Sequence, residues 1–109
     1  MIDQPGVQID DQIRSCLAHR RPVVALESAV LTHGLPAPQN LQALQRMDRA
    51  IRDTGATPAL CLIDQGSLWI GASYERAAAV AGDPHRVKAT ARDLGASMAR
   101  RLPAGLTVS

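Results

Sequence analysis

The sequence has almost no aromatic residues: it holds one tryptophan, one tyrosine and no phenylalanine among its 109 residues. A hydrophobic core must therefore be built from aliphatic side chains, and such a core is thin for a chain of this length. The same shortage argues against nucleic-acid binding, because single-stranded bases stack on aromatic side chains. The net charge of +2 is also too weak to indicate a basic surface, so we expect no nucleic-acid partner.

Cysteine is scarce as well, and the N-terminal stretch "MIDQPGVQIDDQ" is polar and acidic. We therefore expect neither a secretory signal nor a membrane span there. Cys16 and Cys61 fall on an expected helix and an expected strand, which favours two buried free thiols in a reducing compartment over a disulfide. These features predict a cytoplasmic protein without a membrane partner.

Several motifs of known chemistry are also missing. The sequence contains no zinc-type cysteine and histidine spacing, no P-loop and no complete G-x-G-x-x-G. A generic nucleotide-binding module would need such a phosphate loop, so this function is disfavoured.

The pattern of apolar residues predicts alternating helices and strands. The expected helices cover residues 7–20, 40–54, 72–82 and 93–102, with N-caps at Asn40, Ser73 and Asp93. The expected strands cover residues 23–26, 58–64 and 85–91, and residues 65–71 are a tight turn into a short strand, which favours a hairpin. The continuous apolar run Val23–Leu26 is typical of a strand buried on both faces.

This alternation predicts an α/β fold, an incomplete α/β/α sandwich with a mostly parallel sheet. A doubly wound sheet needs more strands than this chain offers. Residues 103–109, "PAGLTVS", resemble a turn before a further helix that Thr107 or Ser109 would cap. We therefore expect residues 1–109 to form a single partial domain.

Glu27 is one of only two glutamates and stands where the apolar run 23–26 ends. Ligands of open parallel sheets bind outside the carboxyl ends of strands, and a partly desolvated carboxylate there suits a general acid. The alternative is a solvated strand-end charge, or a carboxylate that accepts hydrogen bonds from the following loop. Pro36 and Pro38 stiffen that loop, in which His33 is a candidate for substrate binding or proton transfer, or a histidine that bonds a neighbouring carbonyl.

Lys88 is the only lysine beside eleven arginines. A lysine retained in such a chain suggests a need for a compact ammonium group, for example at a phosphate oxygen, although a single lysine also arises by chance. The small-residue stretch 104–109 is a weaker candidate, since a turn of this kind offers backbone amides to a phosphate.

Together these segments resemble the pseudouridine-5'-phosphate glycosidase family, also called the indigoidine-synthase-A-like family. The resemblance rests on "PVVALES" (22–28), "HGLPAPQN" (33–40), "GATPAL" (55–60), "VKATARDL" (87–94) and "TVS" (107–109), which occur in this order. The combination of the first two segments is highly specific. The resemblance covers residues from about 20 onward and implies that this chain corresponds to the N-terminal part of the family's enzymes.

The resemblance implies reversible cleavage of the C–C glycosidic bond of pseudouridine 5'-phosphate into uracil and ribose 5-phosphate. It implies that Glu27 is the catalytic proton donor, that Lys88 and Val108 contact the substrate together with Thr107, and that complete members are homotrimers. The family also uses a nucleophilic lysine and an aspartate that binds manganese. Neither maps onto this sequence, so we expect no metal ligand here.

The sequence departs from the family pattern at a few positions: Ala29 and Leu106 replace hydroxyl residues, and Ala91 and Gly95 replace larger or stiffer ones. We expect no glycosidase activity from this chain by itself, since ring-opened covalent catalysis needs the missing amine. The alternative function is a non-catalytic remnant, or a sugar-phosphate-binding fragment that needs a partner to fold.

Overall fold

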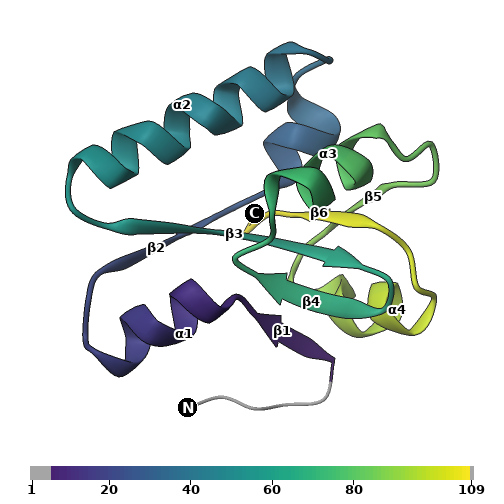
Figure 1. The fold of residues 1–109 in the computed structure, drawn as a ribbon. Helices are drawn as coiled ribbons and strands as arrows, with labels where there is room; N and C mark the ends of the chain where they lie inside the picture. Colours follow the sequence, from purple (N-terminus) through teal and green to yellow (C-terminus); the bar gives the residue numbers. More distant parts are fainter. Residues whose placement is uncertain (1–5, 109) are drawn as a thin grey trace.

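The computed structural model describes residues 6–108, which form a six-stranded sheet with helices on both faces (Figure 1). The strands are β1 (Val7–Ile9), β2 (Val23–Leu26), β3 (Thr57–Asp64), β4 (Ser67–Ile70), β5 (Val87–Ala89) and β6 (Ala104–Leu106). The helices are α1 (Asp11–Ala18), α2 (Gln39–Asp53), α3 (Tyr74–Gly82) and α4 (Leu94–Ala99), with a π-helical turn η1 (Val30–Gly34) and a 3₁₀ turn η2 (Ala91–Asp93). No helix within these residues is long and apolar enough to cross a membrane.

The sheet is mixed and mostly parallel. Its strand order is β1-β4-β3-β6-β5, and β2 pairs with β3 as well. The pairs β1–β4, β2–β3 and β5–β6 are parallel, whereas β3 pairs antiparallel with β4 and β6. Helices α2 and α3 lie on one face and α1 and α4 on the other (Figure 1). The predicted α/β class with a three-layer arrangement is confirmed.

Strand β3 carries two neighbours along one of its edges. Its first half, Thr57–Leu60, pairs with β2, and Leu62 and Ile63 pair with β6. Because β2 runs parallel and β6 antiparallel to β3, the carboxyl ends of β2 and β6 approach each other beside Cys61. We call this junction of β2, β3 and β6 beside Cys61 the fork. Because β6 continues the sheet there, the chain after Leu26 must leave the plane of the sheet.

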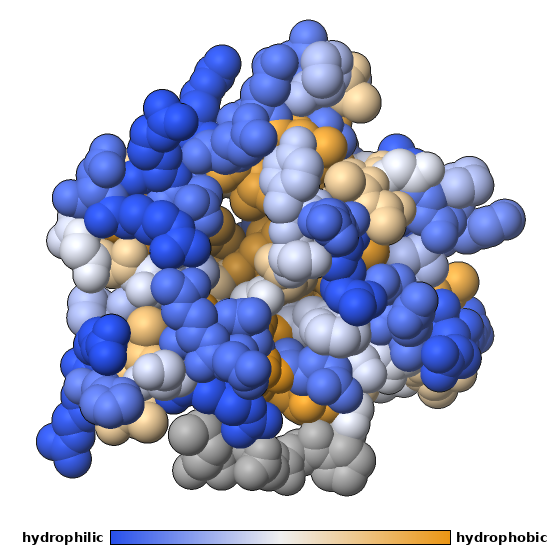
Figure 2. All heavy atoms as spheres, in the orientation of Figure 1, coloured by the Kyte–Doolittle hydropathy of each residue, from blue (hydrophilic) through white to orange (hydrophobic). Residues whose placement is uncertain are grey.

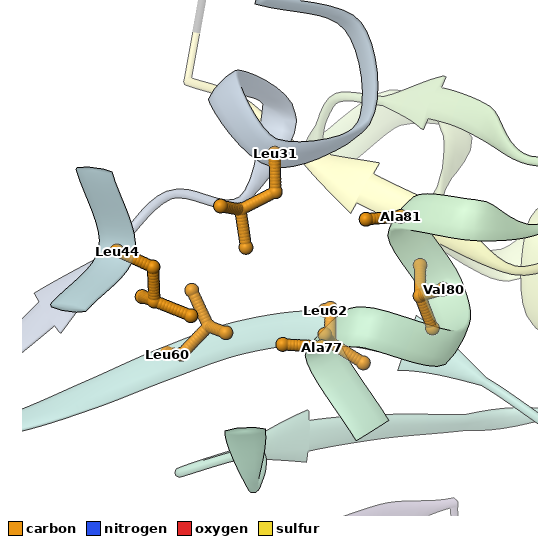
Figure 3. Close-up of a cluster of buried hydrophobic side chains, with 7 residues drawn as sticks. All are labelled: Leu31, Leu44, Leu60, Leu62, Ala77, Val80 and Ala81. Atoms are coloured by element: carbon orange, nitrogen blue, oxygen red, sulfur yellow. The ribbon is translucent and has the colours of Figure 1, made fainter. Parts of the chain in front are cut away.

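The core is aliphatic, as the composition predicts. One cluster lies between the sheet and the helical layer formed by η1, α2 and α3, and Figure 3 shows its side chains pointing toward one another. Its buried members are Leu31, Leu44, Leu60, Leu62, Ala77, Val80 and Ala81. A smaller cluster on the other face joins Ile63, Ala89 and Ala104 to Leu94 and Met98.

Signals confined to a few neighbouring residues are confirmed. Gln65 and Gly66 both have positive φ, 52° and 79°, as the two-residue turn of a hairpin requires, and β3 and β4 form that hairpin. The Ser73 hydroxyl caps α3 by accepting from the Arg76 N–H at 3.1 Å. The two cysteines are free, as predicted; Cys16 is buried as expected, whereas Cys61 is only partly buried, and this burial raises the pKa of its thiol.

The helix predicted over residues 7–20 is wrong in its first part, where Val7–Ile9 is β1. Val7 and Ile9 alternate with Gln8, which is the period of a strand, and the segment pairs with Leu68–Ile70 of β4. A partner 61 positions further along the chain decides this element. Helix α1 begins only after Asp10, whose carboxylate caps it by accepting from the Gln12 N–H.

Two predicted N-caps differ from the structure. Asn40 lies inside α2; its side-chain amide donates to the Leu31 carbonyl at 3.1 Å, and this buried bond fastens η1 to the helix. Asp93 directly precedes α4, but its carboxylate accepts from the Thr90 N–H and hydroxyl at 3.0 and 3.2 Å instead of capping α4. These two bonds hold the pKa of Asp93 below its ordinary value.

The prediction that Val23–Leu26 is buried on both faces is wrong for this chain. The residues do form β2, yet Val24 is 40% exposed and Ala25 is also exposed. The cause is topological: within residues 6–108, β2 pairs only with β3, and its other edge is open.

Candidate functional site

Glu27 immediately follows β2 at the fork of the sheet, and its side chain is exposed. The sequence predicts a carboxylate partly desolvated at the end of a central strand. In this chain the strand is parallel to β3 but lies at an edge of the described sheet, and the Glu27 side chain is exposed instead of partly buried.

Ser28, the next residue, is fully buried and joins the three strands that meet at the fork. Its hydroxyl donates to the Cys61 carbonyl of β3 at 2.6 Å and accepts from the Leu106 N–H of β6 at 2.8 Å. Its own N–H donates to the Leu106 carbonyl at 3.0 Å. The backbone beside Glu27 is therefore held rigidly against the end of β6.

Through Ser28, this junction links the end of β6 to the residue that directly follows Glu27. Thr107 directly follows β6, and its N–H donates to the Ala89 carbonyl of β5 at 3.0 Å. Val108 is 87% exposed. The carboxyl ends of β2, β5 and β6 thus meet in one region, which contains Glu27, Thr107 and Val108.

The prediction that residues 104–109 form a turn is wrong for Ala104–Leu106, and two of the amides that it offered to a phosphate are already used. Ala104–Leu106 is β6, which lies inside the sheet between β3 and β5. The N–H groups of Leu106 and Thr107 are already donated to Ser28 and Ala89. Small residues here serve close packing, and Ser109 lies outside the described residues.

Lys88 lies in the middle of β5 and is exposed. Its register partner on β6 is Gly105, and partners on neighbouring strands direct their side chains to the same face of a sheet. A Cβ on Gly105 would collide with the Thr32 hydroxyl, so η1 covers that face at this point. Lys88 therefore lies on the face of the sheet where η1 packs.

A small polar network connects η1 to the approach to β5. His33 Nδ1 lies 2.7 Å from the Thr32 hydroxyl, and the Arg86 Nε donates to the Thr32 carbonyl at 2.7 Å. Desolvation, followed by the positive charges of Arg86 and Lys88, lowers the pKa of His33. Arg86 and Lys88 therefore place two positive charges near His33, beside the fork.

Sequence reasoning missed Ser28, Thr32 and Arg86. The first two are a serine next to the glutamate and a threonine next to the histidine, and both are buried. Arg86 is one of eleven arginines, and its contact with Thr32 crosses 54 positions of the chain. Only adjacency to Glu27 and His33 could have drawn attention to Ser28 and Thr32.

A separate cavity of about 560 Å³ opens beneath α2. Its floor includes Leu26, Pro58 and Leu60, and Leu44 and Arg49 of α2 contribute to its wall. Figure 2 shows the hollow, with hydrophobic atoms at its base and hydrophilic side chains around its rim. None of Glu27, Lys88, Thr107 and Val108 lines this cavity, so the cavity is separate from the candidate site at the fork.

Within residues 6–108 no group of three or more histidine, cysteine, aspartate or glutamate side chains is placed to hold a metal ion. The side chains at the fork are one carboxylate and several cationic or hydroxyl groups. The cationic and hydroxyl groups suit an anionic ligand, and the single carboxyl group can donate a proton; together they suit a divalent cation less well.

Comparison with known proteins gives concordant matches. The family model described as "Indigoidine synthase A like protein" matches residues 12–109. Pseudouridine-5'-phosphate glycosidase from Caldanaerobacter subterraneus subsp. tengcongensis is 37% identical over 103 residues, covering 94% of this chain and 34% of the relative. The enzyme of the same name from Saccharopolyspora erythraea is 40% identical over 101 residues, covering 93% of this chain and 33% of the relative.

Solved structures agree with this match. The prealnumycin C-glycosynthase AlnA, in complex with ribulose 5-phosphate, superposes with a TM-score of 0.84 at 31% identity, over 97% of this chain and 34% of that one. An indigoidine synthase A-like protein from Thermotoga maritima has a TM-score of 0.79 at 27% identity, over 100% of this chain and 36% of that one. The chain thus spans about a third of the length of the relatives it matches.

Proposed function

Because the chain belongs to the indigoidine synthase A-like family, we propose that it supplies the proton donor and substrate contacts of a pseudouridine-5'-phosphate glycosidase. Several relatives carry that enzyme name, and a related structure holds a sugar phosphate. The reaction in question would separate uracil from ribose 5-phosphate by breaking a C–C bond with net addition of one water, so that the uracil carbon gains a hydrogen and the ribose carbon gains a hydroxyl group.

One observation carries the proposal: Ser28 bonds β3 and β6 at once and so ties the residue that follows Glu27 to the residue that precedes Thr107. Cleavage of a bond between a ribose carbon and a uracil carbon requires a proton on the departing base carbon. Glu27 is the carboxyl group that we assign to this donation, and its rigid backbone is what a positioned general acid needs.

The remaining groups bind the substrate in this proposal. Lys88 is assigned to an oxygen of the sugar phosphate, because an ammonium group is a strong point charge for phosphate. Thr107 and Val108, at the carboxyl end of β6, contact the substrate beside Glu27. The positive charges of Arg86 and Lys88, which act on His33, favour an anionic ligand here.

Two elements of the family's chemistry have no counterpart among these residues. Lys88 is the single lysine and is used for binding, so no second amine is available for a covalent sugar intermediate. The donor set does not fit manganese, so no step is assigned to a metal. We therefore propose that activity requires polypeptide corresponding to the rest of the relatives.

The test combines this chain with the part of the Caldanaerobacter glycosidase that lies beyond the matched region, and it measures uracil release by chromatography. Glu27→Gln should lower kcat about 10²–10⁴-fold and leave sugar-phosphate binding nearly unchanged. Lys88→Ala should raise KM more than it lowers kcat.

The chain offers a matched control for the glutamate. Glu75, its only other glutamate, lies exposed in the first turn of α3, and Glu75→Gln should leave turnover unaltered. Equal losses in Glu27→Gln and Glu75→Gln, or an exchange of the phenotypes of Glu27→Gln and Lys88→Ala, would refute the assigned roles.

A further inference from the structure

Strand β2 has the composition of an interior strand and the surroundings of an edge strand. Its sequence is Val-Val-Ala-Leu, without a polar residue, and runs of this kind occur in strands covered on both sides. In the structure Val24 and Ala25 are nevertheless exposed. The apolar sequence of β2 is typical of a buried strand, but residues 6–108 leave two of its four side chains exposed.

The other open edges of the sheet are protected, and β2 is not. Strand β1 carries Gln8, and strand β5 carries Lys88, each at its central position. Soluble proteins place polar or charged residues on free edges because an unprotected edge pairs with other strands. By this criterion β2, in contrast to β1 and β5, is built to be paired along its open edge.

The backbone of β2 has donors directed outward. The Pro22 carbonyl accepts from the Thr57 N–H at 3.0 Å, so Pro22 faces β3. Since successive residues of a strand direct their backbone groups to opposite sides, Val24 and Leu26 also face β3. The N–H groups of Val23 and Ala25 consequently point away from β3, toward the open edge.

The length of the relatives indicates what occupies this edge. The chain accounts for 34% of the Caldanaerobacter enzyme, so polypeptide of about twice its size accompanies the same fold there. We propose that the free edge of β2 pairs with a strand from polypeptide of that kind, the part of the relatives that lies beyond the matched region. This pairing makes β2 an interior strand and places the new strand beside Glu27, independently of the chemistry assigned to Glu27.

The test mixes the ¹⁵N-labelled 109-residue chain with the unmatched part of the Caldanaerobacter enzyme and measures amide hydrogen exchange by NMR. We expect the amides of Val23 and Ala25 to become at least tenfold more protected. The amides of Val24 and Leu26, which already face β3, should change less. Protection confined to residues around the cavity beneath α2, or no protection in β2, would overturn the proposal.

Two substitutions at one position separate pairing from general effects. Ala25→Pro removes one outward N–H and should weaken binding of the added segment about tenfold or more, since edge prolines are tolerated within a strand but block a new partner. Ala25→Val keeps the N–H and should bind within about threefold of the parent chain. Circular dichroism checks that each variant keeps its fold; if Ala25→Pro unfolds, Ala25→Lys replaces it as a charged edge residue.

Three further results would decide against the proposal. Equal binding by Ala25→Pro and Ala25→Val would show that β2 is not the paired edge. Protection of Val23 and Ala25 that rises with the concentration of the chain by itself would identify a second copy as the occupant. Because none of these measurements uses turnover, a failure of the assigned glycosidase activity would leave them unaffected.

Discussion

Burial lowers the pKa of His33, and the positive charges of Arg86 and Lys88 lower it further. Desolvation and the charges of Arg86 and Lys88 disfavour the imidazolium, so the folded-state pKa lies below the ordinary value of 6.5. For a histidine shifted this way, the contribution to stability is complete above pH 6.5. It declines as the pH falls from 6.5 toward the folded-state pKa, because the unfolded chain then binds the proton more readily.

We predict that Lys88→Gln raises the pKa of His33 toward 6.5, because one of the two neighbouring positive charges is removed. NMR titration of the imidazole signals measures this shift. Lys88→Arg keeps the charge and serves as the control, with a smaller change expected. An unchanged His33 midpoint in Lys88→Gln would show that Lys88 does not lie near η1.

Gly105 is a position where packing admits no side chain. A Cβ there would collide with the Thr32 hydroxyl and lie 2.9 Å from Thr32 Cγ2. Gly105→Ala should therefore lower the free energy of unfolding by about 1–3 kcal/mol, measured by urea unfolding with Trp69 fluorescence.

Two comparisons make the Gly105 prediction specific. Gly82, at the end of α3, has nothing within 4 Å of an added Cβ, so Gly82→Ala should be neutral or stabilise by up to about 1 kcal/mol. Combining Gly105→Ala with Thr32→Ala should recover part of the loss. A Gly105→Ala variant as stable as Gly82→Ala would mean that η1 does not pack on β6.

At the scale of elements, the fork between β2, β3 and β6 depends on one hydroxyl group. Ser28→Ala would remove the acceptor of the Leu106 N–H and the donor to the Cys61 carbonyl. Because the site is fully buried, we predict a loss of about 1–3 kcal/mol in the free energy of unfolding. Urea denaturation of the two proteins measures this difference.

The control for this prediction is Ser15→Ala on the exposed face of α1, which should change stability by less than about 0.5 kcal/mol. Hydrogen exchange adds a local readout: the Leu106 amide should exchange faster in Ser28→Ala. If that amide keeps its protection, the bond to Ser28 does not hold β6 in place.

The elements also show where sequence patterns suffice. The Gln65-Gly66 turn, the Ser73 cap and the buried run of β3 each depend on neighbouring residues, so the sequence predicts them correctly. β1 and β6 have three residues each, and their partners lie far along the chain. Such short strands carry too little periodicity to be separated from a helix start or a turn.

At the scale of the whole molecule, the chain covers about a third of its relatives and contains a single lysine. We predict that the 109-residue chain alone releases no detectable uracil from pseudouridine 5'-phosphate, with or without manganese, because proton donation alone does not break a C–C glycosidic bond. Incubation followed by chromatography tests this. Release of uracil that disappears in Glu27→Gln would show that the chain is active by itself.

The sequence alone determined the α/β class, the family and most helices, because apolar periodicity, caps and the "ALES" and "HGLPAPQN" segments are local properties of the chain. It also singled out Glu27 and Lys88 as candidates by their rarity and position. Only the tertiary structure decided that Ser28 joins three strands, that Thr32 packs over Gly105 and that Arg86 reaches back to η1. These contacts link residues up to 78 positions apart, and no local pattern encodes a pairing that closes so long a loop.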